Sequence, residues 1–255
     1  MCVLACRLLM DPPADGVWNM AVDEAILVWA EQTGQPVFRI YQWQPATLSL
    51  GYFQQWQERG RHSASLGCPM VRRPSGGGAI VHDRELTYCL AMPYGRLPTE
   101  GPSALYRIVH ESLIEVFRDW GISARLWQCS CQPDDRQEEP FLCFQRRNRW
   151  DVVADGPDGG EVKLVGSAQR RSRSALLQHG SILLARSPAA PELPGLSELL
   201  GRPVLPEELW QAWFARLSGK FPWNWTADSL TEQERAAAQR LVQTKYGSNS
   251  WNLRR

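Results

Sequence analysis

The hydrophobic spacing near the amino terminus is that of an amphipathic helix from Asp15 to Gly34. Short apolar runs of strand type follow this helix. Helical spacing then returns up to Trp120, with Ser103 as the predicted cap and Gly121 as the end. The first half of the chain is therefore predicted to be a group of strands between two helices. The strand-like runs span residues 37–43, 47–53, 70–73, 79–81 and 86–92.

The second half of the chain begins with a polar stretch and continues with strands. Residues 127–140 are polar throughout and predict an exposed loop. Two strands, at 152–154 and 162–170, are predicted on either side of the turn 155–160, whose aspartates and glycines favour tight turns. A further strand is predicted at 175–184. This region therefore adds three strands to those of the first half.

The remainder of the chain is predicted to be helical after a proline-rich link at 188–194. One helix covers 207–217 and a second covers 231–246. Thr231 and Glu234 have the spacing of a capping box, which favours a helix start at this point.

The order of these elements predicts the α+β class, because strands dominate the middle and helices flank them without strict alternation. We expect a mixed or antiparallel central sheet with helices around it. The 255 residues suit one large domain or two small ones, and no internal repeat is present. We expect a single domain over residues 1–255, with a helical extension from about residue 205.

Composition narrows the class of protein. A net charge of +1 argues against a polynucleotide as the main partner, since nucleic-acid binders usually carry a clear basic excess. No apolar run approaches the roughly 18 residues that a membrane helix needs, and charges interrupt the amino terminus too early for a signal peptide. Seven cysteines at irregular spacing favour reduced thiols and a cytoplasmic protein. The pair Cys129 and Cys131 is weak as a metal site, so no metal is expected.

The first stretch with chemical potential runs from Arg72 to Asp83. Three consecutive glycines, at 76–78, cost backbone entropy and suit a place where a ligand or another chain segment approaches the backbone closely. Arg72 and Arg73 could clamp a phosphate or carboxylate. A glycine-rich turn beside two solvated arginines is an equally good interpretation. The stretch lacks the Gly-Lys-Ser/Thr ending of a phosphate-binding P-loop.

Two further stretches carry reactive residue types. Lys163 lies in an otherwise apolar strand and is followed by small residues, which permit a substrate to come close, although strand lysines commonly face water. Cys143 is isolated among apolar residues. Such a cysteine is commonly an inert buried thiol. Near a lysine it is instead favoured as a thiolate, and it could then carry an acyl group as a thioester.

Taken together, these stretches resemble the lipoate-protein ligase A and octanoyltransferase family, which shares a catalytic fold with biotin ligases. The similarity runs nearly from end to end and is closest to the cysteine-dependent octanoyltransferase branch. The strongest match is Arg72-Arg73-x-Ser75-Gly76-Gly77-Gly78-Ala79-x-x-His82-Asp83. Other matches are Asn19–Glu24, Arg39–Trp43, Ser49–Gln54, Lys163-x-x-Gly166-Ser167-Ala168-Gln169, Gln178-His179-Gly180-Ser181, Lys245-Tyr246 and Trp251-Asn252.

The resemblance implies roles for the matching positions. Residues 72–78 would line an acyl tunnel and its polar mouth, and Lys163 would lie beside the acyl carbonyl. The backbone of 166–169 would face the reacting thioester, where an N–H could stabilise the oxyanion. Cys143 matches the acylated nucleophile of the octanoyltransferase branch. The substrate-binding set implied by the match is Arg72, Arg73, Ser75, Gly76, Gly77, Gly78, His82, Gly166, Ser167, Ala168, Gln169, His179, Gly180 and Ser181.

Three functions follow from this match. The first is an octanoyltransferase that moves octanoyl from acyl carrier protein through Cys143 to a lysine of a lipoyl domain, such as glycine cleavage H protein or a dehydrogenase E2, without cofactor. The second is a lipoate ligase that uses ATP and Mg²⁺. Residues 146–151 favour it, because they are partly similar to the Arg-Asn-Asp of the ligase branch. The third is a non-catalytic protein that binds an acyl group or its carrier. We expect a monomer in each case.

Some residues are rival candidates for the same roles. Cys89 lies in an alternating strand, where core packing explains it, and Cys68 has no motif support as a nucleophile. His82 and His179 are the best general-base candidates by position, but we expect both to hold loop structure through hydrogen bonds. A basic rim for an acidic carrier protein and an ordinary solvated surface are equally good interpretations of the arginines at 146, 147, 149, 170, 171 and 173.

Overall fold

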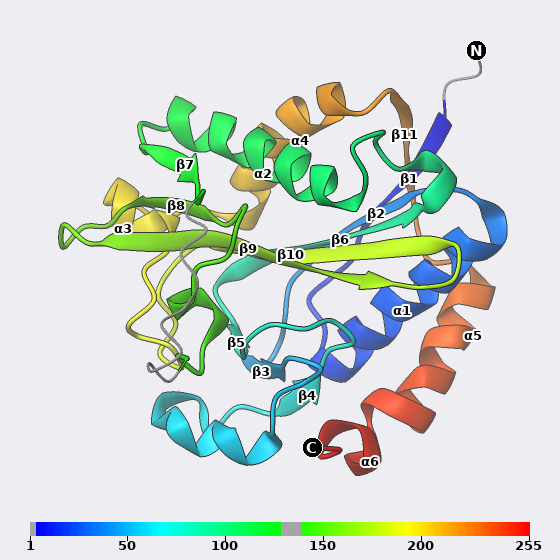
Figure 1. Cartoon of the computed structure of the whole chain (residues 1–255), viewed down its shortest axis with the longest axis horizontal. Helices are drawn as coiled ribbons and strands as arrows, with labels where there is room; N and C mark the ends of the chain where they lie inside the picture. Colours follow the sequence, from blue (N-terminus) through cyan, green and yellow to red (C-terminus); the bar gives the residue numbers. More distant parts are fainter. Residues whose placement is uncertain (1–3, 129–138) are drawn as a thin grey trace.

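Two β-sheets form the framework of residues 4–128 and 139–255, which the computed structural model describes (Figure 1). The larger sheet has eight strands in the order β11-β1-β2-β6-β10-β9-β8-β7, and the smaller has three in the order β4-β3-β5. The larger sheet contains β1 (Leu4–Met10), β2 (Val37–Tyr41), β6 (Glu85–Pro93), β7 (Ala124–Leu126), β8 (Val152–Asp155), β9 (Glu161–Arg171), β10 (Ala175–Leu183) and β11 (Trp223–Asp228). The smaller contains β3 (Thr47–Leu50), β4 (Met70–Arg72) and β5 (Ile80–His82).

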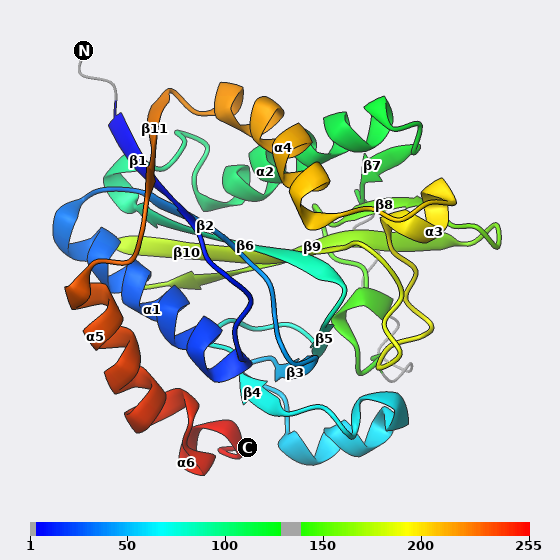
Figure 2. The same cartoon turned by 180° about the vertical axis from the view of Figure 1, so that it is seen from behind.

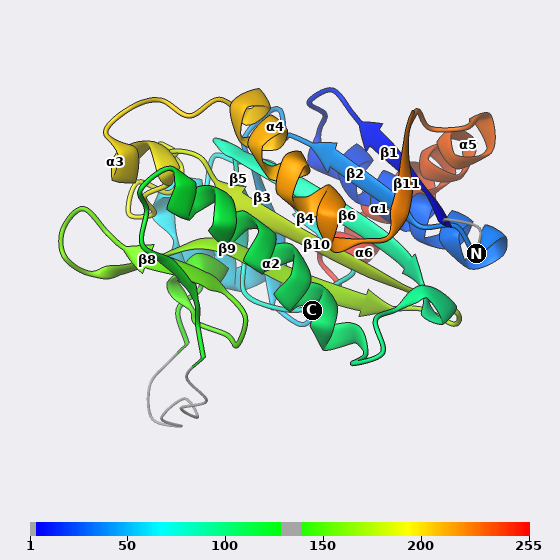
Figure 3. The ribbon, with the colours of Figure 1, turned by 90° about the horizontal axis from the view of Figure 1, so that it is seen from above.

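Helices cover both faces of the larger sheet, and this explains why its central strands are apolar on both sides. Alternate residues of β2 point to opposite faces, so Phe38 packs with α2 and α4 while Val37 packs with α1 and α5. Figure 3 shows α2 and α4 side by side over one face, and Figure 2 shows α1 beside α5. The helices are α1 (Gly16–Thr33), α2 (Pro102–Asp119), α3 (Leu196–Leu200), α4 (Pro206–Leu217), α5 (Glu232–Leu241) and α6 (Asn249–Asn252).

The predicted α+β class and mixed sheet are confirmed. Strand β1 is parallel to β2 and β11, and the other neighbouring pairs in the larger sheet are antiparallel. Helix α1 has the predicted ends, since Asp15 accepts a hydrogen bond from the Trp18 backbone and Gly34 takes the left-handed conformation. The capping box of Thr231 and Glu234 is also present at the start of α5. Along the described residues, no helix has both the length and the hydropathy of a membrane span.

Several predicted boundaries are wrong. Ser103 lies inside α2, and the cap is Gly101, because Pro102 occupies the first helical position where its missing N–H costs nothing. The segment after residue 205 is not wholly helical, since β11 pairs with β1 at the edge of the larger sheet. Strands β1 and β7 were not predicted, and the helix predicted at 231–246 ends at Leu241 and continues as a wider turn to Tyr246. Residues 129–138 of the predicted loop, with Cys129 and Cys131, lie outside the described residues.

Candidate functional site

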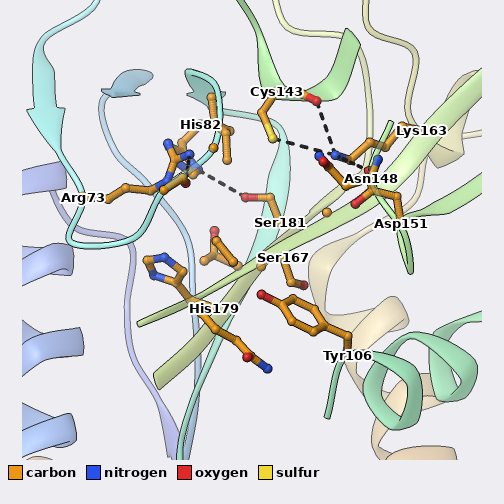
Figure 4. A pocket seen from close by; sticks show the side chains of 18 of the residues that line it. Arg73, His82, Tyr106, Cys143, Asn148, Asp151, Lys163, Ser167, His179 and Ser181 are labelled. Atoms are coloured by element: carbon orange, nitrogen blue, oxygen red, sulfur yellow. Dashed lines mark hydrogen bonds and ion pairs between the residues drawn. The ribbon is translucent and has the colours of Figure 1, made fainter. Parts of the chain in front are cut away.

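A cavity of about 490 Å³ lies against β9 and β10, and most of the residues singled out by the motifs line it (Figure 4). Both catalytic candidates, Cys143 and Lys163, contribute to its wall. Three residues of the predicted set, Arg72, Ser75 and Gly78, do not line it. The predicted residues that do line it are Arg73, Gly76, Gly77, His82, Gly166, Ser167, Ala168, Gln169, His179, Gly180 and Ser181.

Cys143 and Lys163 meet in this wall although twenty residues separate them. Cys143 begins a short 3₁₀ turn, Cys143–Gln145, and its backbone N–H donates to the Ala79 carbonyl over 2.7 Å. The Lys163 ammonium lies 3.7 Å from the Cys143 sulfur and donates to the Cys143 carbonyl over 3.3 Å. The cysteine is partly exposed, so its sulfur is accessible from the cavity. This pair has the elements of an activated thiol, namely a nucleophile with a cation beside it.

A β-bulge in β9 directs Lys163 toward the cavity. Val153 pairs with Lys163 while Val152 pairs with Val165, so Leu164 is an extra residue in the ladder. Residues three apart on a regular strand point to opposite faces. Because of the extra residue between them, Lys163 instead lies over Gly166. A Cβ atom on Gly166 would lie 2.5 Å from Lys163 Cε and 2.9 Å from its Nζ. The glycine therefore provides the space that the lysine side chain occupies.

Asp151 holds the lysine from the other side. Its Oδ2 atom is 2.8 Å from Lys163 Nζ, with side-chain exposures of 5% and 1%. The same oxygen accepts the backbone N–H of Asn148 over 2.7 Å. Burial raises the pKa of Asp151 above its usual value, while the neighbouring Lys163 charge opposes that rise. Asp151 and Asn148 both line the cavity, so this turn forms part of the site.

The two arginines of the first motif donate mainly to backbone carbonyls. Arg72 donates to the backbone carbonyls of Gly51, Gln54 and Asn252 over 2.7 to 3.0 Å, and so fastens the end of the chain to β4. Arg73 is buried and donates to the carbonyls of 49, 76 and 78, which fixes the glycine loop. Burial lowers the pKa of Arg73 to about 10. The expected phosphate or carboxylate clamp is wrong for Arg72, because carbonyl oxygens occupy its donors and it lies outside the cavity.

The glycine loop brings the backbone close to its neighbours. A Cβ on Gly78 would lie 3.0 Å from the Cys143 nitrogen, and one on Gly51 would lie 1.9 Å from the Gly77 carbonyl oxygen. Gly77 itself has a φ of +93°, a conformation that favours glycine. The loop therefore seats Cys143 by close backbone contact.

The histidines of the motifs are engaged in buried hydrogen bonds. His82 contacts the Glu85 carboxylate over 2.6 Å and the Ser49 hydroxyl over 2.8 Å. Burial lowers the pKa of His82 even with Glu85 beside it, so the contact is a hydrogen bond of a neutral ring rather than an ion pair. His179 contacts Ser75 over 2.5 Å and Asp23 over 3.1 Å. Ser75, which does not line the cavity, thus orients a histidine that does.

Sequence reasoning missed several residues of the wall. Asp151 was noticed only as part of a similarity to the ligase branch, and its adjacency to a predicted strand was the available signal. Tyr106 comes from α2, whose amphipathic pattern gives no indication that one residue faces a cavity. The remaining members that were not predicted are Met20, Tyr41, Trp43, Ile80, Thr87, Asn148 and Arg149.

The rival cysteines lie elsewhere. Cys89 is buried, and burial raises the pKa of its thiol well above the usual value. Cys68 is partly exposed but does not line the cavity, and burial raises its pKa as well. Over the described residues, no group of three histidines, cysteines or carboxylates is placed to hold a metal ion.

The arginines proposed as a basic rim occupy different surroundings. Arg149 lines the cavity, whereas Arg146 and Arg147 pair with the carboxylates of Glu139 and Glu161. The arginines at 170, 171 and 173 line a second cavity of about 340 Å³ beside α1. They do not form one continuous rim around Cys143.

Comparison with known proteins identifies the family of this chain. The family model of the lipoyl protein ligase A/B catalytic domain matches residues 15–190. The chain belongs to this family. Octanoyltransferase LipM of Kyrpidia tusciae is 33% identical to it, over 98% of this chain and 98% of the relative.

Solved structures of this family share the fold. Lipoate-protein ligase A bound with ATP superposes with a TM-score of 0.76 at 22% identity, covering 98% of this chain and 99% of that one. A bi-partite lipoate protein ligase from Thermoplasma acidophilum, studied with its E2 lipoyl domain, has a TM-score of 0.73 at 21% identity, covering 99% and 97%. These similarities confirm the predicted ligase-type catalytic fold.

Proposed function

We propose that this chain is an octanoyltransferase in which Cys143 carries the acyl group between two proteins. The contact of 3.7 Å between the Cys143 sulfur and the Lys163 ammonium is the observation that carries the proposal. The full-length similarity to an octanoyltransferase of Kyrpidia tusciae supports it. A ligase needs no nucleophilic cysteine at this place, whereas a transferase that works through a thioester does.

The reaction has two halves, acylation of Cys143 and transfer of the acyl group from Cys143 to a lysine. In the first, Cys143 gives up its proton, the thiolate attacks the acyl carbonyl of a carrier-bound thioester, and the carrier thiolate leaves and takes up a proton in place of the one that Cys143 released. In the second, the neutral amine of a lysine attacks the Cys143 thioester, an amide forms, and the amine proton returns to the Cys143 sulfur. Lys163 stays cationic beside the sulfur in both halves, where it stabilises the thiolate as attacking and as leaving group.

The outer edge of β9 supplies the groups that face the carbonyl oxygen. Strand β8 pairs with β9 only as far as Val165, and no described strand pairs with that edge from Gly166 onward. Backbone N–H groups on that edge are therefore available to an oxyanion, except that of Gln169, which donates to the Tyr106 hydroxyl. Residues 166–169 line the cavity, so a carbonyl held at Cys143 lies against this edge.

The partners follow from the same chemistry. We propose octanoyl-acyl carrier protein as the donor and a lipoyl-domain protein as the acceptor, either glycine cleavage H protein or a dehydrogenase E2. The Thermoplasma acidophilum relative, studied with its E2 lipoyl domain, supports this class of acceptor. We also propose that this protein works as a monomer in the cytoplasm without a cofactor. The four cysteines among the described residues are free thiols, which suits the reducing cytoplasm.

Intact-mass analysis after mixing with octanoyl-carrier protein tests the proposal. We expect an octanoyl adduct that hydroxylamine removes, that the Cys143→Ser variant lacks, and that passes to a lipoyl domain on addition of that domain. Cys68→Ser is the matched control, because Cys68 is also partly exposed but lies outside the cavity. An adduct that persists in Cys143→Ser would exclude this nucleophile. Adenylate formation from lipoate and ATP without any thioester would instead establish the ligase reaction.

A further inference from the structure

A chain of hydrogen bonds, with His110, Tyr88 and Gln178 fully buried, runs behind the cavity from α2 to β9 and β10. His110, on α2, contacts the Trp150 carbonyl through Nδ1 over 2.5 Å and the Ser167 hydroxyl through Nε2 over 2.7 Å. The Ser167 hydroxyl contacts the Tyr88 phenol over 2.7 Å. The Gln178 amide donates to that phenol over 2.8 Å and accepts from the Gln169 amide over 2.8 Å. His110 belongs to none of the sequence motifs, and it has no part in the proposed reaction.

Only one arrangement of protons satisfies the central part of this chain. The Trp150 carbonyl can only accept, so His110 Nδ1 carries the hydrogen. Burial lowers the pKa of His110 to about 4, so the ring is neutral at neutral pH and Nε2 accepts from Ser167. The hydrogen of the Ser167 hydroxyl is then donated to His110. The Tyr88 hydroxyl therefore donates to the Ser167 oxygen. All the donors point in one direction, from Gln169 toward Trp150, and bonds aligned in this way reinforce one another.

This chain of hydrogen bonds connects two parts of the proposed site. At one end lies Gln169, and it shares with Ser167 the part of β9 that lines the cavity beyond the pairing with β8. At the other end, Trp150 immediately precedes Asp151, the partner of Lys163. Trp150 has a φ of +78°, and the left-handed region is costly for a bulky residue unless its surroundings hold it there. The bond from His110 is one of the contacts that hold it.

We propose that His110 is a positioning residue that ties the Asp151 turn to β9, so that Lys163 is kept against Cys143 and the edge of β9 against the acyl carbonyl. The kinetic consequence of this role rests on the proposed acyl transfer. The geometric consequence does not, because the contact between Lys163 and Cys143 is made within the fold itself.

Substitution of His110 by phenylalanine tests the role through two readouts. The first is the rate of Cys143 alkylation by iodoacetamide, measured at neutral pH and at strongly alkaline pH, where thiols in general are ionised. The second is the single-turnover rate of octanoyl transfer from carrier protein to Cys143. We expect His110→Phe to slow alkylation at neutral pH but not at alkaline pH, and to slow acylation roughly 10- to 100-fold, since small misplacements of reacting groups have effects of this size.

His110→Asn separates the two ends of the chain. The asparagine amide can still donate to the Trp150 carbonyl from near the position of Nδ1, but it does not reach Ser167. We therefore expect this variant to alkylate like the unchanged protein and to acylate slowly. In addition, Asp151→Asn combined with His110→Phe should alkylate no more slowly than Asp151→Asn alone, because the histidine acts on the lysine through Asp151.

Ser112→Ala is the matched control for a merely structural effect. Ser112 is fully buried on the same helix and accepts the Trp213 indole N–H over 2.8 Å, away from the cavity. We expect it to lower the melting temperature and to leave both rates unchanged. If His110→Phe also changes only the melting temperature, the positioning role is wrong. If no octanoyl adduct forms on the unchanged protein, the proposed function fails, and the alkylation rates still decide the role of His110.

Discussion

Lys163 and Asp151 form an ion pair that is almost wholly shielded from water, with 2.8 Å between Nζ and Oδ2. Removing two such charges from water costs several kcal/mol per ion, and a pair of apolar side chains often serves stability as well or better. The pair is therefore better explained by the direction it gives to the ammonium than by stability. That direction is toward the sulfur of Cys143.

Replacing Lys163 with methionine should separate these two contributions. We expect the single variant to lose about 3–5 kcal/mol of unfolding free energy, because it leaves the Asp151 carboxylate buried without its partner. It should also lose Cys143 acylation. Lys163→Met combined with Asp151→Asn should regain most of the stability and none of the acylation. Urea denaturation and intact-mass kinetics measure the two effects, and recovery of acylation in the double variant would contradict the role given to the lysine charge.

Gly166→Ala is expected to inactivate the enzyme by displacing Lys163. The added methyl group would lie 2.5 Å from Lys163 Cε, and the lysine cannot retain its contact with Cys143 without moving. Acylation should fall roughly 10- to 100-fold. Gly160→Ala is the matched control, because no atom lies within 4 Å of its added Cβ and its φ is not positive. Equal acylation rates in the two alanine variants would show that Gly166 does not protect the lysine.

The central fold was predictable because its signals are local. Helix α1 has an aspartate at its start and a left-handed glycine at its end, and β6 and β10 are rich in apolar residues and buried along their whole length. Strand β11 carried no such signal. It has six residues, most of them exposed, and it exists because β1 offers it a parallel partner more than 200 residues away. Pairing at that distance leaves no pattern in a short polar stretch.

The site was predictable where a motif names a residue and not where packing decides its direction. Cys143 and Lys163 were found through the family resemblance, yet the bulge at Leu164 that turns the lysine inward is invisible in the apolar pattern. Arg72 and Arg73 are adjacent and identical in type, but one binds the carboxyl-terminal segment and the other the glycine loop. The sequence could not distinguish them, since both sets of acceptors are backbone carbonyls that fold to the arginines from elsewhere.

Arg72 should matter for the end of the chain rather than for the substrate. Its guanidinium donates to Asn252, and its backbone carbonyl accepts the indole N–H of Trp251 over 2.8 Å. We expect Arg72→Met to lower the unfolding free energy by about 2–4 kcal/mol, since it leaves several buried carbonyls without a hydrogen-bond donor. We also expect it to speed digestion by carboxypeptidase. Removal of residues 251–255 should cause a similar loss, and the two changes should not add. Additive losses would place the effect of Arg72 elsewhere.

The stability of the protein should depend on pH through His110. Burial lowers its folded-state pKa to about 4 from the ordinary 6.5, so between these values the unfolded chain binds a proton that the folded chain does not. The stability due to the neutral ring is thus present above pH 6.5 and is lost as the pH falls toward 4, by about 3 kcal/mol in all. His110→Phe lacks this titration, while His82 and Asp23 titrate in both proteins. Urea denaturation at several pH values should therefore show the stability difference between the two proteins narrowing by about this amount as the solution is acidified. A difference that stays constant with pH would mean that His110 is not neutral in the folded protein, and the proton order deduced for its hydrogen bonds would then be wrong.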